Sequence, residues 1–214
     1  MNTKANATTS KGYRSLLKQA RHEHGQANYS QAARLAAEAV RIMENHFSSN
    51  NPVLAQAYTD LSCYRFANYM DANECGVDLP LSYLTDAIKA KEAGVAVLAR
   101  GMSTDCLASH QYELAQWLEM RGSYRKSAKQ LQAMIDTVRD SADSKVSTYK
   151  IILARLGIAR NMRQCGHIDK ATRLFAALPA VKTSALLDGD GPLAAMVIMQ
   201  MVNEAAQLNR ARVN

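Results

Sequence analysis

Residues 27–32 read Ala27-Asn28-Tyr29-Ser30-Gln31-Ala32, and the same pattern returns as Gly122-Ser123-Tyr124-Arg125-Lys126-Ser127 and as Gly166-His167-Ile168-Asp169-Lys170-Ala171. In each copy a small residue closes one helix, a large apolar residue follows two positions later, and a second small residue comes three positions after that. The second small residue allows two helix backbones to approach closely. Because a helix pair of this kind cannot bury its apolar face alone, the repetition predicts a solenoid of stacked pairs.

Composition supports an all-α fold. The chain has 214 residues, of which 48% are apolar and 21% charged, so it is long enough to bury a core and does not have a disordered composition. Ala, Leu, Met, Gln, Arg and Lys dominate, and all of them favour helices. One repeat domain is sufficient to account for this length.

Apolar residues at three-and-four spacing predict a series of helices and their boundaries. The predicted helices cover residues 12–24, 30–47, 52–70, 81–99, 104–120, 124–138, 146–164, 168–178 and 192–208. We expect a disordered tail over 1–11, a repeat domain of about four antiparallel pairs over 12–180, and a loop with one capping helix over 181–214. The stretch 71–80 is predicted to be a longer loop, and Gly94 is expected to weaken or end its helix.

Several segments together resemble the tetratricopeptide repeat family, and the first two pairs are most similar to its kinesin-light-chain-type variant with longer repeats. The segments are Ala32, Ala36 and Ala39 in one helix, then Asn51-Pro52-Val53-Leu54-Ala55, then Leu61-Ser62 in the next helix. Small residues also fall where that family packs its paired helices: Ala20, Ser62, Ala115 and Ala159. The resemblance covers roughly residues 12–180 and implies a right-handed superhelix.

The same resemblance implies a binding surface, because members of the family grip peptides or partner helices on a concave face lined by the first helix of each pair. In this sequence the candidate partner-binding residues on that face are Arg21, Gln56, Thr59, Cys63, Phe66, Tyr112, Gln116, Arg160 and Arg163. We expect Phe66 and Tyr112 to act as apolar anchors and the two last arginines as polar ones. The Lys and Asn set by which some members clamp a C-terminal carboxylate is missing, and Arg155 stands where an apolar side chain is expected.

Charge leaves a nucleic-acid alternative open. The net charge is +7, and basic residues outnumber acidic ones in 1–50 and 151–214 but not in 51–100. Four arginines cluster in the fourth pair, at positions 155, 160, 163 and 173, where they could meet phosphates or an acidic peptide. They also suit the solvated side of two amphipathic helices, and no aromatic residues are interleaved with them for base stacking.

Motifs that could carry catalysis or a metal are weak. The imidazoles of His22 and His24 point about 200 degrees apart on a helix, so they cannot share one ion. Cys165-Gly166-His167 spans a turn with nothing to supply an oxyanion site. The acidic stretch 188–191 lacks the distal Glu of a calcium loop. The sequence therefore predicts no catalytic residue, no metal and no cofactor.

The leading hypothesis from the sequence is a non-catalytic, cytoplasmic adaptor or regulatory module that binds a protein or peptide segment in the groove of a helical-repeat solenoid. No apolar run is long enough for a membrane span, so no membrane partner is expected. Two alternatives stay open, a nucleic-acid-binding repeat protein and a peptide or small-ligand sensor. The Met-rich stretch of Met196, Met199 and Met201 could form an adaptable surface for self-association into a homo-oligomer, but methionines at helical spacing are more often part of a core.

Overall fold

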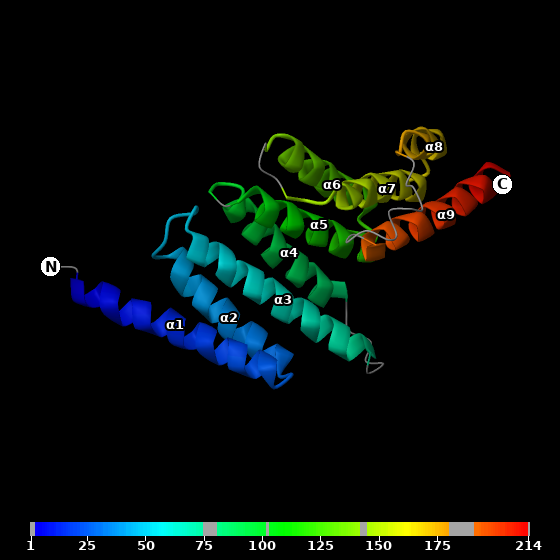
Figure 1. Ribbon diagram of the computed structural model, residues 1–214. Coiled ribbons are helices and arrows are strands. Elements are labelled where there is room, and N and C mark those ends of the chain that lie inside the picture. The colour runs from blue at the N-terminus through cyan, green and yellow to red at the C-terminus, as the bar shows by residue number, and fades with distance from the viewer. Residues whose placement is uncertain (1–2, 75–80, 102, 142–144, 180–190, 214) are drawn as a thin grey trace. The chain divides into compact units, whose positions relative to one another are not determined.

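The computed structural model describes residues 3–74, 81–101, 103–141, 145–179 and 191–213, and every regular element within these ranges is a helix (Figure 1). In chain order they are α1 (Thr3–Gly25), α2 (Tyr29–Glu44), α3 (Pro52–Glu74), α4 (Leu81–Leu98), α5 (Thr104–Met120), α6 (Tyr124–Arg139), α7 (Thr148–Gln164), α8 (Ile168–Ala176) and α9 (Gly191–Val213). The predicted all-α architecture of four antiparallel pairs followed by one more helix is confirmed.

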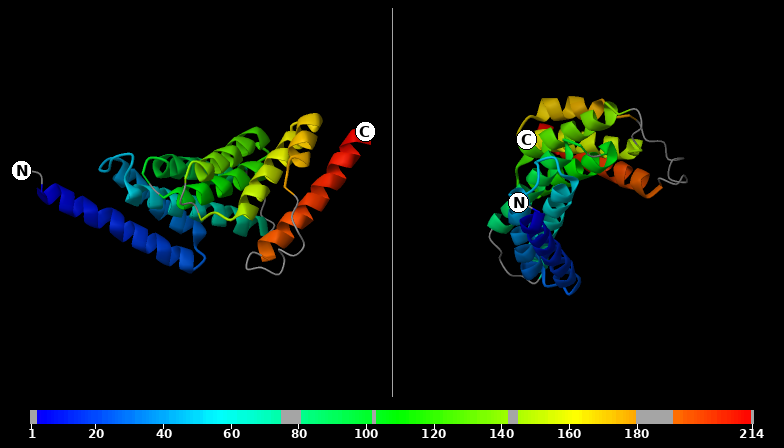
Figure 2. Two further views of the ribbon diagram at one scale, coloured as in Figure 1. Left: turned by 45° about the horizontal axis from the view of Figure 1, so that its top comes forward. Right: turned by 90° about the vertical axis from the view of Figure 1, so that its left-hand side faces the viewer.

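The helices divide into two compact units. Unit 1 spans Met1–Ser103 and unit 2 spans Thr104–Asn214, whereas the sequence predicted one repeat domain over 12–180. In unit 1, α1 packs on α2, α2 on α3, and α3 on α4. In unit 2, α5 packs on α6, α6 on α7, and α7 on α8, while α9 lies against α7 and α8 (Figure 2). The last helix thus caps the final pair, as expected for a stack that would otherwise end on an apolar face.

The repeated motif forms the same turn in all three copies. Its first residue has a left-handed backbone, with φ of 60° at Ala27, 76° at Gly122 and 80° at Gly166. The amide of the following residue donates to a carbonyl five positions earlier, as in Ser123 N to Leu118 O at 2.7 Å and His167 N to Met162 O at 2.9 Å. These bonds define a Schellman turn, which ends one helix and directs the chain straight into the next.

The small residues of the motif lie where helices cross most closely. Their second members, Ala32, Ser127 and Ala171, are completely buried. The positions singled out by the family resemblance, Ala20, Ser62, Ala115 and Ala159, are at most 1% exposed. Larger side chains would not fit there without moving a neighbouring helix. Small residues therefore set the spacing within the pairs, as the sequence predicted.

Each unit has its own apolar core. In unit 1 the inner stripe of α2, which includes Leu35, Val40 and Met43, packs between α1 and α3. In unit 2 a core of Leu131, Met134 and other apolar side chains joins α5, α6 and α7. Fully burying one such side chain stabilises the fold by about 1.5–3 kcal/mol, so packing rather than helix propensity holds these short helices.

Three local predictions differ from the structure. Helix α1 begins at Thr3 and so includes residues 3–11, for which the sequence predicted a tail, because Gly12 weakens a helix without ending it. Helix α3 continues through Glu74, and the rest of the loop predicted over 71–80 lies outside the described residues. Helix α4 runs past Gly94 without ending there, and a Cβ atom at this position would make a tight contact, 3.3 Å from Tyr58 Cβ on α3.

Candidate protein-binding site

In unit 1 the predicted binding residues lie on neighbouring faces of α1 and α3. Arg21 Nη2 lies 3.3 Å from Asp60 Oδ2, and Gln56 Nε2 donates to Asp60 Oδ1 at 2.8 Å. Asp60, which the sequence analysis did not single out, therefore gathers two of the predicted residues around one carboxylate. The predicted residues that continue this face along α3 are Thr59, half-buried; Cys63, exposed; and Phe66, half-buried with its ring 6.4 Å from that of Tyr69.

His22 and His24 lie in the last turn of α1. The ring of His24 lies 4.7 Å from that of Tyr64, and Glu23 accepts a hydrogen bond from Asn28 Nδ2 at 2.9 Å. Burial raises the pKa of the Tyr64 hydroxyl.

Among the described residues no three His, Cys, Asp or Glu side chains come together as a metal site would require. The acidic stretch 188–190, which was weighed as a calcium loop, falls outside the described residues.

In unit 2 the two predicted arginines are held by carboxylates from other helices. Arg160 on α7 forms a two-point pair with Glu119 on α5, in which Nη2 donates to Oε2 at 2.9 Å. Arg163, one turn further along α7, pairs in the same way with Glu204 on α9, with distances of 2.8 and 3.2 Å. The two pairs cross-link the first helices of successive repeats, α5, α7 and α9.

The Arg163–Glu204 pair is largely removed from solvent, whereas the Arg160–Glu119 pair is partly exposed. The two-point geometry makes both pairs specific. The side chains of Arg163 and Glu204 are only 15% and 5% exposed. The hydrogen bond that Arg160 donates to Glu119 is the main cause that raises the pKa of Arg160, so this guanidinium stays charged. The positive charge of each arginine is therefore already compensated by a carboxylate of the same chain. Of the four clustered arginines, Arg155 and Arg173 remain exposed.

Tyr112, the second predicted apolar anchor, is part of the unit 2 core. It is half-buried and packs against a cluster that contains Ile152 and Leu153 of α7 and Val197 of α9. Burial raises the pKa of its hydroxyl. Gln116, one turn further along α5, is exposed. On this face of unit 2, Tyr112 is therefore packed into the core and Gln116 is open to solvent.

A polar groove of about 370 Å³ runs between α7 and α9 on this face. It is lined by Arg160, Arg163, Gln164, Gln200, Asn203, Glu204 and Gln207. The structure thus brings two predicted residues together with four carboxamide side chains that the sequence analysis missed. The spacing of residues 200, 203 and 207 places them on one face of a helix, and this spacing was the available signal.

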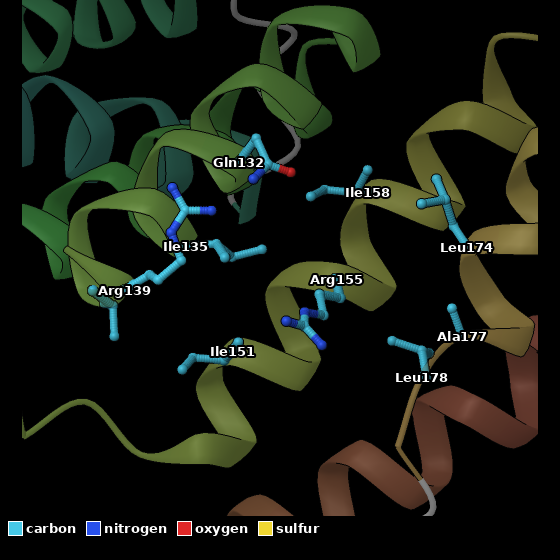
Figure 3. A pocket seen from close by; sticks show the side chains of 10 residues that line it. Gln132, Ile135, Arg139, Ile151, Arg155, Ile158, Leu174, Ala177 and Leu178 are labelled. Carbon is cyan, nitrogen blue, oxygen red and sulfur yellow. The ribbon is translucent and has the colours of Figure 1, made fainter.

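A second, apolar groove of about 480 Å³ lies between α6 and α8, with α7 as its floor (Figure 3). One wall consists of Ile135, Val138 and Arg139 from α6. The other consists of Leu174 from α8 and of Ala177 and Leu178, which follow the end of α8. Ile151, Arg155 and Ile158 follow one another along the floor. The sequence analysis noted Arg155 as a departure from the repeat pattern but did not infer a groove.

No protein-family model matches this sequence, and the comparison with curated proteins also gives no match. Solved structures do match. The TPR-like repeats of a kinesin light chain from Podosopora anserina superpose with a TM-score of 0.54, at 18% identity over 94% of this chain and 92% of that one. The chain has a tetratricopeptide-like repeat fold. A second structure of the Podosopora anserina repeats gives a TM-score of 0.52 at 17% identity over 92% of this chain and 96% of that one.

BtubC from P. vanneervenii is a further TPR-like match, with a TM-score of 0.52 and 11% identity over 78% of this chain and 66% of that chain. At these identities the TPR-like comparison establishes the fold alone. Within the described ranges, no helix combines the length and the apolar character that crossing a lipid bilayer requires.

Proposed function

We propose that this protein is a non-catalytic interaction module that binds an extended segment of another protein in the polar groove between α7 and α9. The observation that carries the proposal is the row of carboxamides in that groove, Gln164, Gln200, Asn203 and Gln207, beside arginines that are already paired. The groove lies on the face of the first helices, where the TPR-like fold places its ligands.

The chemistry of the groove suits a peptide backbone. A carboxamide offers both donors and an acceptor, so a row of four can pair with the alternating N–H and C=O groups of an extended chain. The salt bridges of Arg160 and Arg163 fix α5, α7 and α9 relative to one another within unit 2. A groove whose walls are ordered beforehand loses little conformational entropy on binding.

The paired arginines favour a protein ligand over a nucleic acid. Binding to phosphates draws its affinity from unpaired cations and weakens by orders of magnitude as salt rises several-fold. In this groove both guanidinium groups face carboxylates instead. We therefore keep nucleic-acid binding as an outcome of the test rather than as a second proposal.

Site-specific photo-crosslinking in the native host tests the proposal. A benzophenone amino acid at Asn203 should form a discrete protein adduct, and one at Lys129, exposed on α6, should not. The adduct should still form when the salt concentration is raised threefold before irradiation, and it should survive nuclease treatment. An adduct that nuclease removes, or equal yields from the two positions, would show that the groove is not a protein-binding site.

Unit 1 offers a second test of the predicted contact face. Phe66→Ala removes a half-buried ring from α3 while leaving the Arg21–Asp60 pair in place. If unit 1 contributes to the same interaction, this variant should lower the yield of the Asn203 adduct. An unchanged yield would restrict the binding surface to unit 2.

The cytoplasmic location and the adaptor role stay predictions of the sequence.

A further inference from the structure

The apolar groove of unit 2 is a separate surface from the polar groove and shares no lining residue with it. Ile135 and Val138 on α6 are 8% exposed and form its inner wall. Ile151, Ile158, Leu174 and Leu178 are only half-buried, so the described part of the chain leaves their apolar surface open to water. Helices α6 and α8 both pack on α7, and the groove lies between them.

Charge decides what such a groove can accept. Of the lining residues that the structure describes, two are arginines and none is acidic. Arg155 is exposed at the centre of the floor and makes no hydrogen bond or ion pair within the described ranges. Arg139 pairs with Asp136 and Asp140 at 3.2 Å, but these pairs are exposed and contribute little, so a ligand carboxylate can replace them. An apolar segment with carboxylates at its edge is therefore complementary to this surface.

The dimensions fit one face of a helix. Ile151 and Ile158 are seven residues apart on α7, which corresponds to two turns, or about 10 Å. Apolar side chains at positions i, i+4 and i+7 of a partner helix cover the same length. Figure 3 shows the side chains of α6 on one side and those of α8 on the other, with Arg155 between them.

We propose that the groove between α6 and α8 is a second docking site, which binds an acidic amphipathic helix of a partner protein. Apolar side chains of that helix cover Ile135, Ile151 and Leu174, and a Glu or Asp on its flank pairs with Arg155. The site lies between the second helices of two repeats and shares no lining residue with the polar groove, so both can be occupied together. It does not depend on the proposed function of that groove.

Selection from a phage-displayed library of random 16-residue peptides on the full-length protein tests this site. Enriched peptides should share apolar residues at i, i+4 and i+7 with an adjacent Asp or Glu. A fluorescein-labelled copy of the best peptide should lose at least tenfold in affinity for Arg155→Glu, because two like charges then meet. The affinity for Lys150→Glu, an exposed charge reversal about 140 degrees around α7, should stay within twofold.

Further outcomes separate this proposal from others. Asn203→Ala should leave the peptide affinity unchanged, and a loss there would move the site to the polar groove. No enrichment, enriched peptides without carboxylates, or equal binding to Arg155→Glu would overturn the proposal. A wild-type dimer in sedimentation velocity that Arg155→Glu dissociates would show that a second copy of the chain fills the groove, which would also overturn it.

Discussion

Arg163 and Glu204 lie on different helices, α7 and α9, and form a two-point ion pair whose side chains are 15% and 5% exposed. The pair attaches the final helix of the chain to the last repeat. Since Glu204 is buried, its charge is tolerated only because the guanidinium satisfies both oxygens. A residue that the sequence marked as a ligand for partners is therefore also part of the internal structure of unit 2.

Removing one member of this pair should destabilise unit 2 strongly. Glu204→Ala leaves the Arg163 charge half-enclosed without a partner, and we expect a loss of about 2–4 kcal/mol in the free energy of unfolding. Urea denaturation followed by circular dichroism measures this loss. Arg139→Ala, which removes two exposed pairs, should cost less than about 1 kcal/mol. Similar losses for both variants would contradict the structural role of the pair.

Gly157 on α7 should resist replacement by alanine. A Cβ atom there would lie 2.7 Å from Leu131 Cδ1, and Leu131 is 3% exposed in the α6–α7 contact. Overpacking costs about 1–3 kcal/mol, which exceeds the gain of about 1 kcal/mol in helix propensity. Thermal denaturation should show a lower Tm for Gly157→Ala.

Two controls separate the contact from the helix. Gly12→Ala, at a helical site with nothing within 4 Å of the added atom, should raise stability. In a Leu131→Ala background, Gly157→Ala should also become stabilising, because the clash is gone. If Gly157→Ala still lowered the Tm in that background, the close contact would not be its cause.

The repeated turn predicts opposite effects for two reciprocal changes. Ala27 has a left-handed backbone that costs a non-glycine residue about 1–2 kcal/mol. Ala27→Gly should therefore stabilise the protein, by about 0.5–1 kcal/mol after the larger entropy of glycine in the unfolded chain is counted. Gly122→Ala should destabilise it by about 1 kcal/mol, since no atom lies near the added Cβ and only the backbone is strained. Chemical denaturation of both variants checks the signs, and equal signs would contradict the shared turn.

Stability should fall at alkaline pH because of Tyr58. Burial, together with a hydrogen bond from its hydroxyl to Glu44, raises the pKa of Tyr58 from 10.0 to about 12. Above pH 10 the unfolded chain releases this proton while the folded chain keeps it, so the stabilisation present below pH 10 is lost as the pH rises through about 12. Tyr58→Phe should flatten this part of the pH profile of the unfolding free energy. Identical slopes for the two proteins from pH 10 to 12 would show that the group titrates normally.

The two grooves that we propose as binding surfaces could be predicted from the sequence to different degrees. The face of the first helices in unit 2 could be predicted, because the repeat register places Arg160 and Arg163 on it. The groove beside α9 and the groove beneath α8 could not, because each depends on which helix lies next to α7. The sequence showed Arg155 at a position where the repeat pattern expects an apolar side chain, but only the structure places it in the groove between α6 and α8.

The sequence by itself determined the helix pairs, the Schellman turns at Ala27, Gly122 and Gly166, and the small residues that set helix spacing. These features depend on apolar periodicity and backbone conformation, which act over a few residues. Only the tertiary structure decided that Arg160 meets Glu119 and that Arg163 meets Glu204. Each of those pairs joins residues 41 positions apart, and no local rule links charges at that separation until the packed helices bring them together.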